Sequence, residues 1–253
     1  MVDAGGPVGA DALPLTGERT VPGIPSENYW FRRHEAAYEH LLAQVAGATL
    51  LEVGSGEGYG TDLLAGTARH VLGVDYDSAA VTHARARYPV PSFVRANLAA
   101  LPVRSGSVDV VATLQVIEHV WDHGQFVREC LRVLRPGGRL LVTTPNRLTF
   151  SPGRETPLNP FHTKEFTAAE LTGLLVSNGL VVDAVLGLHA GARLGELDAR
   201  YGSFVDAQLA DDPQAWTPEL LADVAGVTTA DFPIHERDVD ASLDLVVAAH
   251  RNG

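Results

Sequence analysis

The sequence predicts an α/β protein with a Rossmann-like, mostly parallel sheet, and three observations support this fold class. Short apolar segments alternate with segments of helical periodicity between residues 49 and 145, which is the pattern of successive β-α-β units. A run of glycines follows the first apolar segment, and polar side chains follow several of the later ones. Because open α/β sheets bind ligands at the carboxyl ends of their strands, the same pattern predicts a binding site.

The alternation assigns seven strands, with helices on both faces of the sheet. Apolar runs rich in Val and Leu predict buried strands, and a spacing of three or four residues between apolar positions predicts helices. The expected strands cover residues 49–53, 70–77, 92–98, 108–114, 139–145, 180–188 and 242–250. The expected helices cover residues 28–46, 61–68, 78–88, 124–134 and 167–179.

Two segments stand apart from this alternation. Residues 1–28 are rich in Gly and Pro and lack periodicity, so we expect a flexible arm or lid, followed by a single domain over residues 29–253. Residues 189–240 separate the sixth and seventh strands and carry weak helical signals at 203–210 and 217–225. This stretch is too long for a plain connection, and we interpret it as an inserted cap over the site.

The composition excludes several classes of protein. The chain has 31 acidic and 19 basic residues, for a net charge of −12, whereas nucleic acids and anionic membranes attract basic surfaces. No apolar run reaches the roughly 18 residues of a membrane span, and the first residues lack the pattern of a signal peptide. The single cysteine, Cys130, excludes an internal disulfide. We therefore expect a cytoplasmic protein that does not bind nucleic acid; no pattern indicates its oligomeric state.

The glycine run GSGEGYG, residues 54–60, follows the first strand and precedes a helix. In that position glycines let the backbone approach a ligand and present N–H groups to it. The dinucleotide fingerprint G-x-G-x-x-G fails, because a match starting at Gly54 needs glycine where the chain has Tyr59. Glu52, two residues before Gly54, suits a ligand that carries an ammonium group. The loop therefore disfavours a nicotinamide cofactor.

Polar side chains stand at the ends of the next three strands. Asp75 lies 21 residues after Gly54, where a carboxylate beside a glycine loop accepts both ribose hydroxyls. The alternative role for Asp75, a helix cap, suits Asp77 or Ser78 better. Asn97 ends the third strand, where its amide can meet an adenine edge, and Gln115 ends the fourth. Together these residues predict a nucleoside-binding edge.

The motifs LLEVGSGEGYG, GVDYD, RANLAALP, SVDVVATLQVIEHV and RVLRPGGRLLVTTPN resemble, in order and spacing, those of class I S-adenosylmethionine-dependent methyltransferases. The resemblance implies a seven-stranded sheet with an antiparallel last strand and S-adenosyl-L-methionine as cofactor. Many members have Asp where this chain has Asn97. The resemblance assigns the methionine part of the cofactor to Glu52, Gly54 and Gly56, with Gln115 facing that end, the ribose to Asp75, and the adenine to Tyr76, Asn97 and Leu98.

Three further segments resemble a narrower group, the actinobacterial methyltransferases associated with methylglucose lipopolysaccharide biosynthesis. They are LTGERTVPGIPSENYWFRRHE, TPNRLTFSPGRETPLNPFHTKEFTAAEL and VTTADF. This resemblance implies O-methylation of a saccharide hydroxyl, with a small-molecule or oligosaccharide acceptor. Two other functions remain open: methylation of an aromatic or polyketide metabolite, and cofactor binding without catalysis.

Three residues after the fourth and fifth strands are candidates for catalysis: Glu118, His119 and His162. An alcohol acceptor needs its proton removed by a general base or acidified by a metal. Ubiquinone-pathway and small-RNA O-methyltransferases carry E-x-x-E-H after this strand and bind a divalent metal there; this chain has Gln115 in place of the first Glu. Three interpretations remain open: the three residues bind Mg²⁺ or Mn²⁺, one histidine is a metal-free base, or Glu118 and His119 only line the pocket.

The segment NYWFRRHE contributes two further candidates for cofactor binding. Tyr29 and Arg33 are placed to close over the carboxylate of the cofactor, because the Arg guanidinium presents a fork of donors that fits a carboxylate.

Overall fold

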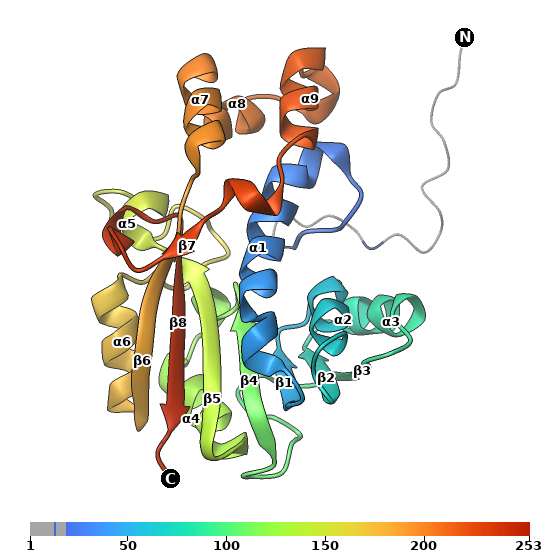
Figure 1. Cartoon of the computed structure of the whole chain (residues 1–253), viewed down its shortest axis with the longest axis vertical. Helices are drawn as coiled ribbons and strands as arrows, with labels where there is room; N and C mark the ends of the chain where they lie inside the picture. The colour runs from blue at the N-terminus through green and yellow to red at the C-terminus, as the bar shows by residue number, and fades with distance from the viewer. Residues whose placement is uncertain (1–12, 14–18) are drawn as a thin grey trace.

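A twisted sheet with helices on both faces forms the body of the molecule (Figure 1). The computed structural model describes Leu13 and residues 19–253, so most of the predicted arm lies outside the described residues. The strand order is β3-β2-β1-β4-β5-β8-β6-β7. Strands β1 to β5 are parallel, and β8 lies antiparallel between β5 and β6. The predicted α/β fold, with its antiparallel last strand, is confirmed.

The predicted strands and helices begin and end within three residues of the observed ones except β5, which begins five residues before the predicted residue 139. The strands are β1 Thr49–Val53, β2 His70–Asp75, β3 Ser92–Arg95, β4 Val108–Leu114, β5 Leu134–Pro145, β6 Leu180–Leu188, β7 Ile234–His235 and β8 Asp244–Arg251. The helices are α1 Asn28–Val45, α2 Tyr59–Ala65, α3 Ser78–Arg87, α4 His123–Val133, α5 Arg147–Phe150, α6 Ala168–Ser177, α7 Ala192–Tyr201, α8 Phe204–Leu209 and α9 Pro218–Ala225.

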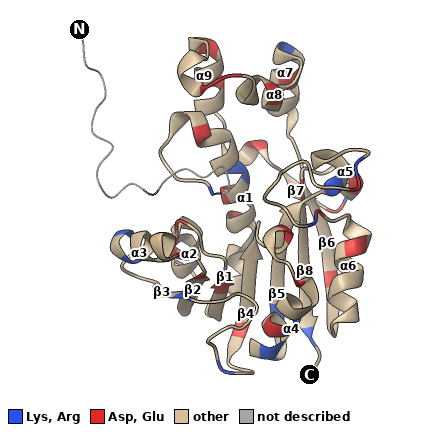
Figure 2. Ribbon diagram, turned by 180° about the vertical axis from the view of Figure 1, so that it is seen from behind, with Lys and Arg blue, Asp and Glu red and all other residues tan. Residues whose placement is uncertain are grey.

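The two faces of the sheet support separate hydrophobic cores. On one face, α1 and α2 bury Leu41, Val45 and Leu64 against Leu50 of β1. On the other face, α4 and α6 cover the alternate residues of the same strands (Figure 2). Each central strand is thus buried on both sides, which is why these segments read as continuous apolar runs.

The sheet has eight strands rather than the predicted seven. The extra strand, β7, is only two residues long and pairs with the end of β6, Gly187 lying opposite His235. It belongs to the segment 189–240, as does α7, a ten-residue helix that the sequence reading missed. A strand this short leaves no period-2 pattern to detect. In α7, Leu194, Leu197 and Tyr201 do have helical spacing, but Gly195 lowers the helix propensity of the segment.

Helices α7, α8 and α9 lie beyond the carboxyl edge of the sheet, against the first half of α1 (Figure 1). Tyr29 of α1 is buried there, with its ring edge-on to Phe204 of α8 and to Phe232. The Asn28 amide also donates hydrogen bonds to the carbonyl oxygens of Val224 and Val227. These contacts fix the segment 189–240 to α1.

A buried ion pair joins α1 to the sheet. Arg33 donates from Nε to Asp244 Oδ2 at 2.6 Å and from Nη2 to Asp244 Oδ1 at 2.7 Å, and Nη2 also meets the Leu243 carbonyl oxygen. Asp244 begins β8, so it lies at the carboxyl edge of the parallel strands. The neighbouring carboxylate raises the pKa of Arg33 against the opposing effect of burial, and the guanidinium stays charged.

None of the described helices is long and apolar enough to cross a membrane. Basic side chains are distributed over the described elements rather than gathered along one of them (Figure 2).

We expect Arg33→Met to lower the free energy of unfolding by about 3–5 kcal/mol, because it leaves the Asp244 carboxylate buried without its partner. The double variant Arg33→Met/Asp244→Leu should be more stable than the single variant, since it removes both charges. The matched control is Arg32→Met on the same helix, whose partner Glu35 is nearer the surface and whose loss should cost at most about 1 kcal/mol. Chemical denaturation measures all three; equal losses for Arg33→Met and Arg32→Met would contradict the assignment.

Candidate active site at the carboxyl edge of the sheet

The glycine loop between β1 and α2 has a conformation that other residues cannot adopt. Gly54 and Gly58 have φ values of +85° and +103°. A Cβ at Gly54 would lie 2.3 Å from Val116 Cγ2, and one at Gly58 would lie 2.8 Å from Ala84 Cβ. The loop is held against β2 because Gly54 and Ser55 both donate backbone hydrogen bonds to the Val74 carbonyl oxygen. These bonds hold the loop at the carboxyl end of β2.

Glu52 is buried beneath this loop. Its carboxyl accepts a hydrogen bond from Tyr38 of α1 at 2.7 Å and another from Thr61 of α2. Burial raises the pKa of Glu52 to about 7, and the Asp75 charge adds to the shift. An ammonium group nearby would favour the charged form. Tyr38 and Thr61 could not be predicted as hydrogen-bond donors to Glu52, because nothing in the sequence spacing links them to this carboxyl.

Asp75 joins the end of β2 to the glycine loop. Its Oδ2 accepts from the Gly56 backbone N–H at 2.8 Å, and its Oδ1 accepts from the Asp77 N–H at 2.9 Å. The helix cap of α3 is supplied by Asp77, as the sequence predicts. Of the three residues assigned to adenine, Tyr76 and Asn97 are exposed and Leu98 is half-buried.

Gln115, directly after β4, has a left-handed backbone with φ 56°. Such a conformation is uncommon outside glycine and clusters at functional sites. Its side-chain amide is half-buried and lies 3.4 Å from Thr143 Oγ1 at the end of β5. Gln115, Gly54 and Asp75 therefore follow three neighbouring strands, β4, β1 and β2, at one edge of the sheet.

The described part of the amino-terminal segment lies against this edge. Arg19 forms an ion pair with Asp77 at 2.9 Å, and the Thr20 hydroxyl lies 2.9 Å from Tyr59 Oη and 3.3 Å from His34 Nδ1. Burial lowers the pKa of His34 to about 4, so its ring is neutral at pH 7. The segment thus spans the start of α3 and the start of α2.

The structure brings Glu118, His119 and His162 together. One donor atom of each lies within 4.8 Å of the others, and the two imidazole rings meet edge to face with centroids 4.8 Å apart. Glu118 is buried, and its Oε2 accepts from Thr144 Oγ1 at 2.9 Å. The connection is tertiary: the backbone N–H of Thr163 donates to the Glu118 carbonyl oxygen.

These three side chains form a donor set that could hold a divalent metal. Donor atoms on one ion at about 2.1 Å lie no more than about 4.2 Å apart, so the cluster needs to close by about half an ångström. One carboxylate and two imidazoles suit a transition metal such as Mn²⁺ better than Mg²⁺, which prefers oxygen ligands. The residues fit a metal, and they equally offer two imidazoles for proton transfer.

Two neighbours of His162 were not identified from the sequence. Its Nδ1 lies 2.9 Å from Glu165 Oε1, and its Nε2 lies 3.1 Å from Asn159 Nδ2. The signal for this arrangement is the spacing of three residues on each side of the histidine, which lets a turn bring all three side chains together. That spacing is too common to be read without the fold.

Tyr29 and Arg33, which the sequence offers as cofactor-binding residues, have partners within the protein. The Tyr29 ring packs in the aromatic cluster with Phe204 and Phe232. Two nitrogens of the Arg33 guanidinium donate to Asp244. The donors that we expected to bind the cofactor carboxylate therefore bind a carboxylate of the chain itself.

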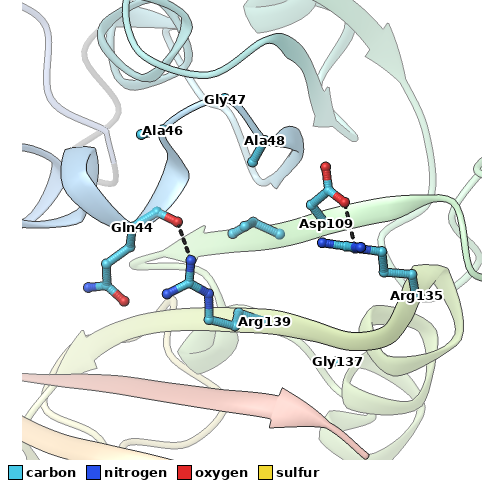
Figure 3. Close-up of a pocket in the computed structure, with 9 residues that line it drawn as sticks. Gln44, Ala46, Gly47, Ala48, Asp109, Arg135, Gly137 and Arg139 are labelled. Carbon is cyan, nitrogen blue, oxygen red and sulfur yellow. Dashed lines mark hydrogen bonds and ion pairs between the residues drawn. The ribbon is translucent and has the colours of Figure 1, made fainter. Parts of the chain in front are cut away.

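A separate polar hollow of about 280 Å³ lies at the opposite, amino-terminal edge of the strands (Figure 3). Its charged side chains are engaged with the protein itself: Arg135 pairs with Asp109 at 2.6 Å, and Arg139 donates to the Gln44 carbonyl oxygen at 2.7 Å. Because ligands of open α/β sheets bind at the carboxyl edge, these groups act as structural links between β4, β5 and α1.

The chain belongs to the S-adenosylmethionine-dependent methyltransferases. Residues 51–142 match the methyltransferase domain family. The chain is 60% identical over 248 residues to the "Probable S-adenosylmethionine-dependent methyltransferase" of Mycolicibacterium smegmatis, covering 95% of this chain and 96% of that protein. It is 56% identical over 246 residues to a protein of the same description from Mycobacterium tuberculosis, covering 94% and 90%.

Solved structures share the fold at low sequence identity. A chain of the complex between the Haloferax volcanii Trm112 methyltransferase activator and a methyltransferase aligns with a TM-score of 0.62 at 18% identity, covering 90% of this chain and 94% of that chain. The S-adenosylmethionine-dependent methyltransferase of Mesorhizobium loti aligns with a TM-score of 0.57 at 20% identity, covering 87% and 98%. The protein is therefore an enzyme that uses S-adenosyl-L-methionine as methyl donor.

The raised pKa of Glu52 makes stability depend on pH. Between its ordinary value of 4.5 and about 7, the folded protein binds more protons at this residue than the unfolded chain, so the free energy of unfolding falls as pH rises. Glu52→Gln cannot ionise. We expect the stability of the cofactor-free variant, relative to wild type, to increase by about 2–3 kcal/mol between pH 4.5 and pH 8.

Denaturant titrations at several pH values check this prediction. The pKa of His34, lowered to about 4 by burial, also makes the free energy of unfolding fall as pH drops below about 6.5. This effect is the same in wild type and in Glu52→Gln, so it cancels in the comparison. Glu39→Gln, an exposed carboxyl on the same helix as Tyr38, is the control and should show no such trend. A pH-independent difference for Glu52→Gln would overturn the assignment.

Proposed function

We propose that this methyltransferase transfers a methyl group to a hydroxyl of a saccharide, such as a glucoside or a polysaccharide precursor. The observation that carries the O-methylation is the cluster of Glu118, His119 and His162, in which two imidazoles lie beside a buried carboxyl. The saccharide is supported by the narrower sequence resemblance. Cytoplasmic location is proposed with it, in keeping with the absence of a membrane-spanning helix among the described residues.

The cofactor residues are proposed to hold S-adenosyl-L-methionine along the strand ends. Gly54 and Gly56 would leave room for the methionine part, and Glu52 would counter its ammonium charge. The carboxylate of Asp75 would accept the ribose hydroxyls, with Tyr76 beside the adenine. The bound cofactor supplies an activated methyl on sulfur, so the protein's tasks are to align the acceptor oxygen with it and to remove the hydroxyl proton.

Exposed aromatic side chains flank the imidazoles, and they support a sugar acceptor. Trp121, two residues after His119, is 90% exposed, and Phe161, next to His162, is 60% exposed. The two segments that carry them are joined by side chain–backbone hydrogen bonds: Phe161 O accepts from His119 Nδ1 at 3.2 Å, and Val120 O accepts from Thr163 Oγ1 at 2.6 Å. Aromatic faces outside the core offer apolar area beside polar groups, which suits the C–H face of a pyranose ring.

Two segments are proposed to enclose the bound molecules. The segment 189–240 would act as a cap on the acceptor side, because it packs on α1 beyond the carboxyl edge. The amino-terminal segment would cover the adenosine, because Arg19 and Thr20 already contact residues on either side of the glycine loop. Both would reduce the access of water to the transferred methyl group.

We expect purified protein with methyl-labelled S-adenosyl-L-methionine to convert a glucoside acceptor into its methyl ether. The variant Trp121→Ala should raise KM for the acceptor while leaving cofactor binding unchanged, because the ring lies outside the cofactor residues. Val90→Ala, an exposed apolar side chain before the amino-terminal end of β3, is the control.

Three outcomes separate the functions. A methyl ether on the glucoside supports the proposal. If a phenol or polyketide acceptor is methylated and no glucoside is, the acceptor is a small aromatic or polyketide metabolite rather than a saccharide. Binding of S-adenosylhomocysteine by calorimetry without turnover of either acceptor would indicate a protein that binds the cofactor without catalysis.

The cluster admits a second form of this chemistry, in which Glu118, His119 and His162 hold a divalent metal that would lower the pKa of an acceptor hydroxyl. Chelation should then abolish activity and Mn²⁺ should restore it. Glu118→Gln should weaken Mn²⁺ binding measured by calorimetry, whereas His123→Gln, an imidazole outside the cluster, should not. Activity that survives chelation, together with no Mn²⁺ binding, refutes the metal and leaves a histidine as the base.

A further inference from the structure

The His162 ring is held at both of its nitrogens. Nδ1 lies 2.9 Å from Glu165 Oε1, and Nε2 lies 3.1 Å from Asn159 Nδ2. The ring also rests on Phe150, with centroids 5.4 Å apart and the planes tilted by 32°. Packing and hydrogen bonds together leave this imidazole a single orientation.

The position of the proton on the ring follows from the Asn159 amide. The backbone N–H of Phe161 donates to Asn159 Oδ1 at 2.9 Å, which identifies the other amide atom, Nδ2, as the one that faces His162. An amide nitrogen only donates, so Nε2 of the neutral ring must accept and the ring proton must lie on Nδ1. The Glu165 carboxylate accepts that proton's hydrogen bond. Both partners therefore select the Nδ1–H form of His162.

Glu165 is fully buried beside His162. The exposed fractions of the His162 and Glu165 side chains are 5% and 0%. Among the described residues, the second carboxyl oxygen, Glu165 Oε2, has no hydrogen-bond partner. A buried, half-satisfied carboxylate costs stability, and an apolar residue would fill this place at lower cost. The carboxyl of Glu165 bonds the His162 imidazole, and the low polarity of the buried surroundings strengthens that hydrogen bond.

We propose that Glu165 is a positioning residue that keeps the Nε2 lone pair of His162 directed at the acceptor hydroxyl. This inference rests on the proposed O-methylation in its metal-free form, because a metal on Nε2 would occupy the lone pair that this role needs. In the reaction the acceptor displaces the Asn159 amide from Nε2. As the new oxygen–carbon bond forms, the methyl–sulfur bond breaks with its electron pair left on sulfur. The hydroxyl proton passes to Nε2, and the resulting imidazolium keeps its Nδ1–H on Glu165 before losing the proton to water.

The kinetic test compares Glu165→Leu, Glu165→Gln and His162→Gln on the glucoside acceptor. Glu165→Leu should lower kcat about 10²-fold and His162→Gln about 10²- to 10⁴-fold, with unchanged affinity for S-adenosylhomocysteine. Glu165→Gln, whose amide oxygen can still accept from Nδ1, should recover most of the activity. In the His162→Gln background, Glu165→Leu should cause no further loss, because Glu165 acts only through this ring. Glu155→Gln, an exposed carboxyl in the same loop, should match wild type.

A spectroscopic test needs no acceptor. In protein labelled with ¹⁵N-histidine, the His162 signals, identified by their loss in His162→Gln, should show the proton on Nδ1 in wild type and Glu165→Gln. The downfield Nδ1 proton signal should vanish in Glu165→Leu. A proton on Nε2 in wild type, or a Glu165→Leu loss that persists in the His162→Gln background, would falsify the proposal. If no glucoside is methylated, the saccharide assignment fails while the NMR result still decides the role of Glu165.

Discussion

The buried ion pair between Arg33 and Asp244 is the interaction on which the arrangement of this molecule depends. Asp244 starts the antiparallel strand β8 at the same edge where the parallel strands end, and Arg33 comes from α1, which also carries the contacts to α7–α9. One bidentate contact therefore sets the position of α1 relative to the sheet. Since the Tyr38 hydroxyl that binds Glu52 lies on the same helix, the ion pair also supports the glycine loop.

The position of His162 beside Glu118 and His119 depends on a second tertiary connection. The segment after β5 folds back so that Thr163 bonds the Glu118 and Val120 carbonyl oxygens through its backbone and hydroxyl. This contact brings His162 against His119 although 43 positions separate them in the sequence. Glu165 and Asn159 then fix the ring at both nitrogens. The loop thus fixes the orientation of the imidazole through its own contacts, which would reduce the reorganisation needed for the proposed proton transfer.

The strands were predictable because burial on both faces leaves long apolar runs, and β1, β4 and β6 begin and end at the predicted residues. The glycine loop was predictable because positive φ at Gly54 restricts the residue type. The partners of Glu52 and His162 were not predictable, because they come from other elements or from spacings that occur widely. The role given to Arg33 shows the same limit: its fork of donors does fit a carboxylate, and the carboxylate that it meets in the fold is Asp244.

The sequence by itself determined the α/β class, the edge of the sheet that forms the site, and the methyltransferase family, since each is written in local patterns of period, glycine and strand-end polarity. Tertiary structure alone decided how the amino-terminal helix and the segment 189–240 pack together, and which groups surround each titratable side chain. It also decided that Glu118, His119 and His162 form one cluster. The physical reason is that burial and hydrogen bonding at these residues arise from chain segments far apart in sequence, whose approach is fixed only when the whole core packs.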